Sequence, residues 1–247
     1  MKKFIVLITF ALISFTNKDS ITIFLAGDST MADKPIEDNP ERGWGQVFSR
    51  FFNDQVKIEN HARNGRSTKS FIDQGRWDSL INRVSKGDYV FIQFGHNDSK
   101  KDDPNRYAEA HTDYKNNLIR FVNDCKNKGA TPVLLTPVVR RRFDENGNFF
   151  DIHGDYPEVV REVAREQNVF LIDLNQKSAK LVSGLGVERS KELYLHIEPG
   201  KYKLLPDGKK DDTHFSKYGA MRMAQLVVDG IKELNIDLKN YLQEKNE

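Results

Sequence analysis

The chain has only one cysteine among its 247 residues, Cys125, so no disulfide can form within it. This excludes a disulfide scaffold and a cysteine-rich metal cluster. The chain also lacks an excess of charge of either sign, because it has 38 Lys and Arg and 36 Asp and Glu residues, which gives a net charge of +2. Such a balance gives no support for a nucleic-acid partner. Cys125 follows Leu118, Phe121 and Val122 at helical spacing, which favours a core residue over a nucleophile.

Long hydrophobic runs are missing after residue 20, so no later segment is expected to span a membrane. At the start, Lys2 and Lys3 precede an apolar run from Phe4 to Phe15, and a polar stretch follows. This layout predicts a signal peptide over residues 1–20 and export to the periplasm or the exterior. Its removal takes three lysines and one aspartate, which lowers the net charge from +2 to about zero. The absence of a clear A-x-A cleavage site leaves an uncleaved N-terminal anchor as the alternative.

Apolar runs and helical periodicity alternate along the rest of the chain. Five runs predict strands: residues 21–26, 56–60, 89–94, 132–136 and 169–173. Apolar residues recur at helical spacing over residues 44–52, 77–84, 114–125, 158–166 and 217–234. This alternation predicts an α/β fold, with a five-stranded parallel sheet covered by helices on both faces. No composition break divides residues 21–247, so we expect one domain with irregular loops at 140–151 and 190–212.

Small or polar residues follow three of the predicted strands. Ser29 comes after the first strand, Gly65 after the second and Asn97 after the third. Parallel strands bring such ends to one edge of the sheet, where ligands bind. The backbone N–H groups of Ser29 and Gly65 and the amide of Asn97 are candidates for a three-donor oxyanion hole. Taken singly, Ser29 equally suits a turn or a helix N-cap, Gly65 an ordinary turn and Asn97 a loop.

A histidine and a carboxylate come just before the last predicted helix, in the sequence DDTH. His214 can act as a general base near neutral pH. Asp211, three residues earlier, can fold back within one turn and hold the imidazole, and the adjacent Asp212 is the weaker candidate. The D-x-x-H pattern is common by chance, so its weight comes from its combination with the three strand ends.

Four motif texts occur in order: G-D-S-T at 27–30, N-x-A-x-x-G-R-S at 60–67, G-H-N-D at 95–98 and D-D-T-H at 211–214. With these motifs the chain resembles the SGNH (GDSL-type) hydrolase superfamily, and most of all its rhamnogalacturonan acetylesterase family. The resemblance spans about residues 21–234. It implies a flavodoxin-like three-layer α/β/α sandwich, the SGNH hydrolase fold. It also implies removal of acetyl groups from pectic rhamnogalacturonan, with no metal or other cofactor.

Carried over position by position, the resemblance makes Ser29 the nucleophile, His214 the general base and then acid, and Asp211 the orienting carboxylate. Ser29, Gly65 and Asn97 then supply the oxyanion hole. Acyl transfer through an acyl-enzyme fits these residue types in any fold. The G-x-S-x-G turn of α/β-hydrolases is absent, and no H-E-x-x-H motif or Cys/His cluster predicts a metal site.

The implied partner is an acetylated plant cell-wall polysaccharide or oligosaccharide. Arg140, Arg141 and Arg142 follow the fourth predicted strand, and guanidinium groups bind carboxylates such as those of galacturonate. We expect one of the three to contact the polymer, the alternative being a solvated basic run. His96 is expected to line the cleft. Trp44 suits a sugar platform, but its place in an apolar helical stripe favours the core.

Other readings of the same residues stay open. A related esterase would act on acetylated xylan, other acetylated sugars or a lipid, because the motifs specify acyl transfer better than the alcohol released. The charged stretches at 140–151 and 201–212 argue against the apolar channel that a lipase needs. A non-catalytic carbohydrate-binding surface protein is the alternative of another class. The intact set of Ser29, Asn97, Asp211 and His214 argues against it, and a covalent serine probe would separate the two.

Overall fold

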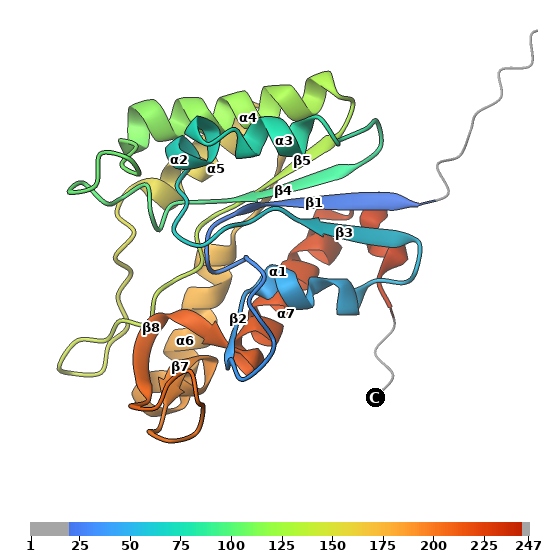
Figure 1. Ribbon diagram of the computed structural model, residues 1–247. Helices are drawn as coiled ribbons and strands as arrows, with labels where there is room; N and C mark the ends of the chain where they lie inside the picture. The colour runs from blue at the N-terminus through green and yellow to red at the C-terminus, as the bar shows by residue number, and fades with distance from the viewer. Residues whose placement is uncertain (1–19, 244–247) are drawn as a thin grey trace, which may run out of the picture.

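The computed structural model describes residues 20–243, and its centre is a five-stranded parallel sheet in the order β3-β1-β4-β5-β6 (Figure 1). The strands are β1 (Ile21–Gly27), β3 (Val56–Asn60), β4 (Tyr89–Gln93), β5 (Thr131–Leu135) and β6 (Phe170–Ile172). Each begins and ends within one residue of its predicted bounds, so the five predicted strands are confirmed. Apart from Ser20, the predicted signal peptide lies outside the described residues.

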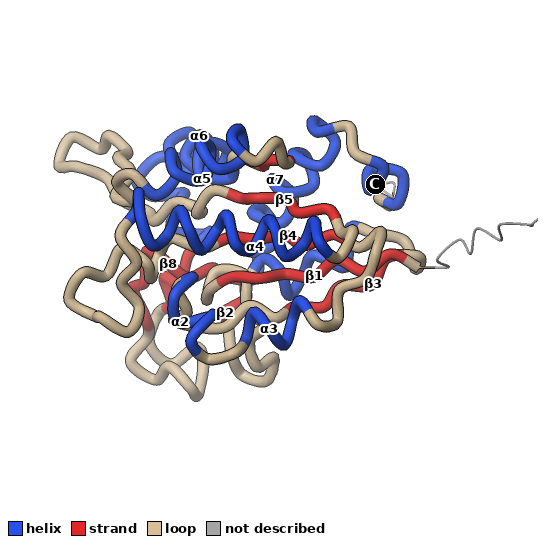
Figure 2. The backbone as a smooth tube through the Cα atoms, turned by 90° about the horizontal axis from the view of Figure 1, so that it is seen from above, coloured by secondary structure: helices blue, strands red, loops and turns tan. Residues whose placement is uncertain are grey.

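Helices cover both faces of this sheet (Figures 1 and 2). One face carries α2 (Thr68–Asp73), α3 (Arg76–Ile81), α4 (Lys115–Asn127) and α5 (Tyr156–Glu166). The other face carries α1 (Trp44–Val47), α6 (Leu174–Arg189) and α7 (Lys217–Leu234). Successive side chains of a strand point to opposite faces. Accordingly, Ile23 and Leu25 of β1 pack in the core with α7, whereas Phe24 and Ala26 pack in the core with α4. The expected three-layer α/β/α sandwich is confirmed.

Two residues with alternative interpretations belong to the core. Trp44 is fully buried, and its Nε1–H donates to Oε1 of Gln93 at 2.8 Å. Cys125 is also fully buried, and burial raises the pKa of its thiol far above the ordinary value. The core interpretation is therefore confirmed for both. The helix predicted over 44–52 is present but changes after α1 into a 3₁₀-helix, Phe48–Phe51.

The prediction of an irregular stretch over 190–212 is wrong at both ends and confirmed for residues 198–208, which form turns and one isolated bridge. This part of the chain contains β7 (Tyr194–Ile197) and the first half of β8 (Lys209–Ser216), which join β2 (Glu41–Arg42) in an antiparallel sheet of order β2-β8-β7. The sequence of β8, KKDDTHFS, has no alternating apolar face, so it carries no strand signal. The stretch 140–151 is irregular apart from one isolated bridge, Phe143 to Phe149. Among the helices of residues 20–243, none is both long and apolar enough to cross a membrane.

Candidate active site

Ser29 lies on a tight turn directly beyond β1. The carbonyl of Asp28 accepts hydrogen bonds from the backbone N–H groups of Met31 and Ala32, at 3.3 and 3.0 Å. Gly27, the last residue of β1, has no room for a side chain, because a Cβ there would lie 2.8 Å from the carbonyl oxygen of Gln93. The sequence G-D-S thus ends the strand against its neighbour β4 and turns Ser29 toward the edge of the sheet.

A chain of buried hydrogen bonds supports this turn from below. Trp44 Nε1–H donates to Gln93 Oε1, and Gln93 Nε2–H donates to Thr30 Oγ1, both at 2.8 Å. The Thr30 hydroxyl donates to Asp28 Oδ1 at 2.8 Å, and His96 Nδ1 lies 3.0 Å from Asp28 Oδ2. Burial by itself raises the pKa of Asp28, but the contacts with His96 and Thr30 outweigh it and lower that pKa to about 2. Both carboxylate oxygens of Asp28 have hydrogen-bond partners, Thr30 at Oδ1 and His96 at Oδ2, which fixes the turn.

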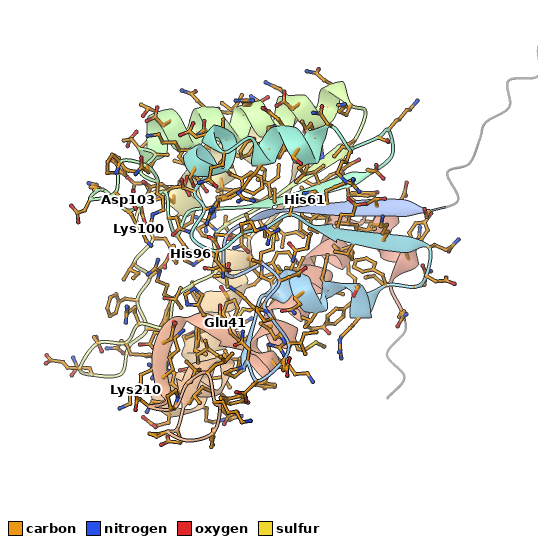
Figure 3. The ribbon with its side chains drawn as sticks, in the orientation of Figure 1. Glu41, His61, His96, Lys100, Asp103 and Lys210 are labelled. Carbon is orange, nitrogen blue, oxygen red and sulfur yellow. The ribbon has the colours of Figure 1, made fainter. Side chains whose placement is uncertain are left out.

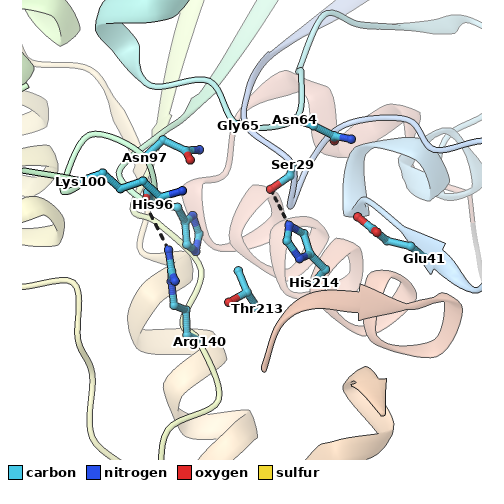
Figure 4. Close-up of a pocket in the computed structure, with 10 residues that line it drawn as sticks. All are labelled: Ser29, Glu41, Asn64, Gly65, His96, Asn97, Lys100, Arg140, Thr213 and His214. Carbon is cyan, nitrogen blue, oxygen red and sulfur yellow. Dashed lines mark hydrogen bonds between the residues drawn. The ribbon is translucent and has the colours of Figure 1, made fainter. Parts of the chain in front are cut away.

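His214 stands between a hydroxyl and a carboxylate. Its Nε2 lies 2.9 Å from Ser29 Oγ, and its Nδ1 lies 2.8 Å from Asp211 Oδ2 (Figure 4 shows the Ser29 contact). Asp211 Oδ1 accepts from the backbone N–H groups of Thr213 and His214. Burial raises the pKa of Asp211, but these hydrogen bonds outweigh it and hold that pKa well below its usual range. This is the geometry in which an imidazole accepts a hydroxyl proton while a carboxylate holds it in place.

A bulge in β8 aims His214 at Ser29. In the register of β7 and β8, Leu195 faces Asp211 and Tyr194 faces Phe215, so residues 212–214 are extra on the β8 side. A bulge redirects the side chains that it contains. The D-x-x-H spacing therefore works from a bulged strand, and Asp211 folds back to His214 as the sequence indicated.

Three hydrogen-bond donors gather beside Ser29 Oγ. The backbone N–H groups of Ser29 and Gly65 have no hydrogen-bond partner within residues 20–243. Gly65 has a φ of 75°, a left-handed conformation that glycine adopts without strain. The Asn97 side chain is oriented by two contacts: Nδ2–H donates to the carbonyl of Arg66 at 3.0 Å, and Oδ1 accepts from Arg106 at 3.4 Å. In Figure 4 its amide nitrogen points toward Ser29, so its second hydrogen is free for a bound oxyanion.

Comparison with known proteins supports the likeness seen in the motifs. Residues 19–222 match the family described as GDSL-like Lipase/Acylhydrolase. The chain belongs to this family. The Bacillus subtilis protein named rhamnogalacturonan acetylesterase RhgT is 43% identical over 225 residues, which cover 91% of this chain and 95% of RhgT. The B. subtilis protein named probable rhamnogalacturonan acetylesterase YesY is 39% identical over 216 residues, 87% of this chain and 94% of YesY.

Solved structures agree with the family's fold. The crystal structure of protein YxiM from Bacillus subtilis has a TM-score of 0.76 at 26% identity and covers 88% of this chain and 58% of that one. A mutant of the acetylxylan esterase Axe2 from Geobacillus stearothermophilus has a TM-score of 0.61 at 16% identity, over 91% of this chain and 97% of that one. The likeness to Axe2 shows the fold alone.

In this GDSL-like hydrolase, Ser29 opens into a pocket of about 380 Å³. The pocket unites most of the sequence-predicted site residues, while Asp211 lies behind His214. The lining residues are Ser29, Glu41, Asn64, Gly65, His96, Asn97, Lys100, Arg140, Thr213 and His214. Four of them carried no sequence signal: Glu41, Asn64, Lys100 and Thr213. Asn64 and Thr213 lie within the motifs at 60–67 and 211–214, and inspection of every motif position would have found them. Glu41 comes from the short strand β2 and Lys100 from the loop after β4, and neither lies in a motif.

The three consecutive arginines have different surroundings. Arg140 lines the pocket, and its Nη2–H donates to the carbonyl of His96 at 3.2 Å. Arg141 is buried and pairs with Asp212 Oδ1 at 3.0 Å, and Arg142 lies 3.3 Å from Asp212 Oδ2. Neither Arg141 nor Arg142 lines the pocket, because Asp212 holds both guanidinium groups. The same contacts explain why Asp212 does not hold the imidazole of the site.

His96 faces the pocket as a buried hydrogen-bond acceptor. Asp28 is ionised, so the proton of the His96 ring lies on Nδ1, toward that carboxylate. Burial, partly offset by Asp28, lowers the pKa of His96 and favours the neutral ring. Its Nε2 has no hydrogen-bond partner among the residues that the structure describes.

Proposed function

We propose that this chain is a serine carbohydrate esterase that removes acetyl groups from pectic rhamnogalacturonan. As a GDSL-like acylhydrolase it is a carboxylic ester hydrolase. The observation that carries the proposal is the hydrogen-bonded series Ser29–His214–Asp211 beside three convergent donors. The pectic substrate is supported by the names of RhgT and YesY, which align with nearly the whole chain.

In the proposed mechanism, Ser29 Oγ attacks the acetyl carbonyl carbon while His214 Nε2 accepts the hydroxyl proton across 2.9 Å. The backbone N–H groups of Ser29 and Gly65 and the amide of Asn97 stabilise the negative oxygen of the tetrahedral intermediate. The intermediate collapses, the bond to the sugar oxygen breaks, and the protonated His214 gives its proton to that oxygen. The products of this half-reaction are the deacetylated sugar hydroxyl and acetyl-Ser29.

Water completes the cycle through the same groups. His214 takes a proton from a water molecule as the water oxygen attacks the acetyl carbon, and the donors again hold the oxyanion. The ester bond to Ser29 breaks, His214 returns the proton to Oγ, and acetate leaves. Throughout, the ionised Asp211 holds Nδ1–H and stabilises the transient imidazolium. Each step uses only the chain's own side chains, backbone N–H groups and water.

We also propose that residues 1–20 direct export, because an acetylated cell-wall polysaccharide is met outside the cytoplasm.

The pocket supports a carbohydrate over a lipid substrate. Its walls are charged or polar at Glu41, Lys100 and Arg140, whereas an acyl chain requires an apolar channel.

The test is acetate release from acetylated rhamnogalacturonan by the purified mature chain. Acetylated xylan serves as the competing substrate, and Ser29→Ala serves as the inactive control. We expect preferential release from rhamnogalacturonan that Ser29→Ala abolishes. Release from xylan alone would retain the mechanism and contradict the pectic substrate. A folded chain that releases no acetate and resists a serine-directed fluorophosphonate would instead be a binding protein.

A further inference from the structure

Two cations in the pocket have no anionic partner. Lys100 and Arg140 both line it, and neither lies within ion-pair distance of a carboxylate among residues 20–243. Other cations near the site are neutralised: Lys34 pairs with Glu41 at 2.7 Å, and Arg141 pairs with Asp212 at 3.0 Å. No direct ion pair within the described chain therefore neutralises the positive charge of this wall, and the carboxylates of Asp28, Asp103 and Asp211 act on it only from beyond ion-pair distance.

The backbone around the pocket presents these two cations toward the reacting centre. Arg140 follows β5 and is fixed by its hydrogen bond to the carbonyl of His96, a contact that leaves its other N–H groups available. Lys100 belongs to the loop after β4, where its backbone N–H donates to the carbonyl of Asn97 at 3.3 Å. Figure 4 shows both side chains on the same side of Ser29.

Both cations lie where their charge is disfavoured. Partial burial lowers the pKa of Arg140, and partial burial together with the positive charges of Arg106 and Arg140 lowers the pKa of Lys100. An anion bound between the two side chains would relieve this repulsion and replace lost hydration. A planar carboxylate suits the site, because a guanidinium fork and an ammonium group both donate to carboxylate oxygens.

The opposite side of the pocket carries an ion pair and no net positive charge. Glu41 faces Ser29 from β2, and the ammonium group of Lys34, itself buried, fixes its carboxylate in place. Figure 3 shows Glu41 apart from Lys100 and His96, and Figure 4 shows Ser29 between Glu41 and these two residues. An anionic sugar is therefore attracted to the side of Lys100 and Arg140 and not to the side of the Lys34–Glu41 pair, so the charge pattern favours one orientation across Ser29.

We propose that Lys100 and Arg140 form a carboxylate subsite that binds a hexuronate unit of the substrate and orients the sugar chain across Ser29. The proposal rests on the proposed function and adds to it which side of the pocket binds the acidic sugar. Lys100 gave no sequence signal, and Arg140 is separated here from its two neighbours. The other two arginines have a structural task at Asp212.

The test compares an acidic polymer with its neutral counterpart. Acetylated rhamnogalacturonan and the same polymer with its uronate carboxyls reduced to alcohols are assayed with wild type, Lys100→Ala and Arg140→Ala. Each substitution should raise the KM ratio of acidic to neutral polymer about tenfold, the loss of one charge-assisted contact at a partly exposed site. Arg140→Lys, which keeps the charge but not the fork, should recover part of this loss.

Lys101→Ala is the matched control, because Lys101 is exposed, carries the same charge one residue away and does not line the catalytic pocket. It should leave the KM ratio within about twofold of wild type, since an exposed charge is largely screened. An equal rise in Lys101→Ala would show general attraction of the polymer and overturn the subsite. So would equal KM changes on acidic and neutral polymer in Lys100→Ala and Arg140→Ala.

A separate measurement distinguishes failure of the subsite from failure of the proposed function. If wild type releases no acetate from rhamnogalacturonan, the proposed function is wrong. Competitive inhibition of p-nitrophenyl acetate hydrolysis by unacetylated oligogalacturonate then tests carboxylate binding by Lys100 and Arg140, independently of the natural substrate. Weaker inhibition in Lys100→Ala and Arg140→Ala than in Lys101→Ala supports the subsite, and equal inhibition in all three contradicts it.

Discussion

Replacement of Asp211 by asparagine tests how the imidazole of the site is held. The two carboxylate oxygens have different partners: Oδ1 accepts from the N–H groups of Thr213 and His214, and Oδ2 faces His214 Nδ1 at 2.8 Å. In Asp211→Asn the two N–H groups retain the amide oxygen at the Oδ1 position. The amide NH₂ group then faces Nδ1 as a donor. His214 must therefore carry its proton on Nε2, where it cannot accept the proton of Ser29.

The expected loss follows from the distance between the two charges. At 2.8 Å and an effective dielectric constant of about 20, the attraction between imidazolium and carboxylate is about 6 kcal/mol. That energy corresponds to roughly 10⁴-fold in rate, the size known for a wrong tautomer in serine triads. The Asp211 side chain is 15% exposed, and solvent screening reduces the effect. We expect kcat to fall by about 10³ to 10⁴, with KM unchanged because Asp211 does not line the pocket.

Steady-state acetate release measures this prediction, and Asp212→Asn is the matched control. Asp212 is the adjacent carboxylate and pairs with Arg141, Arg142 and His196 instead of His214. Asp212→Asn should lower stability but keep kcat within about tenfold of wild type. A kcat for Asp211→Asn within tenfold of wild type, or an equal loss in Asp212→Asn, would refute this account of the imidazole.

The remaining predictions concern the supports of the site. Lys34 donates to the side chain of Asn64, so Lys34→Met releases the loop that carries Gly65. It should lower kcat by about tenfold to a hundredfold in steady-state assays, and a change in KM alone would contradict this prediction. The pKa of Asp28 is about 2 in the fold against 3.8 ordinarily, so its ionised form stabilises the fold by about 2 kcal/mol above pH 4. This stability is lost as the pH falls from about 4 to 2. Urea unfolding at several pH values should show the loss in wild type and not in Asp28→Asn. An equal dependence of the free energy of unfolding on pH in the two proteins would contradict this prediction. Arg141→Met should lower the free energy of unfolding by about 2–3 kcal/mol, because it leaves Asp212 partly unpaired. It should not raise the KM ratio of acidic to neutral polymer. A rise in this ratio like that in Arg140→Ala would show instead that Arg141 contacts the substrate.

The strands and their order of appearance were predictable because hydrophobic burial determines them. The central strands β1, β4 and β5 are short apolar runs, and their burial on both faces makes those runs nearly continuous, whereas the edge strand β3 is partly exposed. Ser29, Gly65 and Asn97 follow β1, β3 and β4, which are neighbours in the sheet. The convergence of these three residues at one edge therefore follows from topology and needs no knowledge of side-chain contacts.

The second sheet was not predictable from the sequence, because its central strand has no apolar face. Backbone pairing with β2 and β7 holds β8, and the bulge that aims His214 depends on a register between distant segments. The D-x-x-H spacing nevertheless identified the contact of Asp211 and His214, since both lie in one local turn of the chain.

The charged residues of the pocket were only partly predictable from the sequence. Sequence alone placed three arginines after the fourth strand, but only a contact with the distant Asp212 separates Arg141 and Arg142 from Arg140. Lys100 reaches the pocket from the loop after β4 and Glu41 from the two-residue strand β2, and neither belongs to a motif. Their roles depend on which opposite charges lie nearby, and only the folded arrangement determines this.

The central claim is that Ser29 is the nucleophile of an acetylesterase, and acetate release by wild type and Ser29→Ala tests it most directly. Both proteins are assayed on acetylated rhamnogalacturonan, and circular dichroism verifies that the variant is folded. We predict that wild type releases acetate and that Ser29→Ala loses at least about 10³-fold in kcat, because no other hydroxyl contacts His214 Nε2 within residues 20–243. A folded Ser29→Ala that releases acetate at close to the wild-type rate would contradict the account.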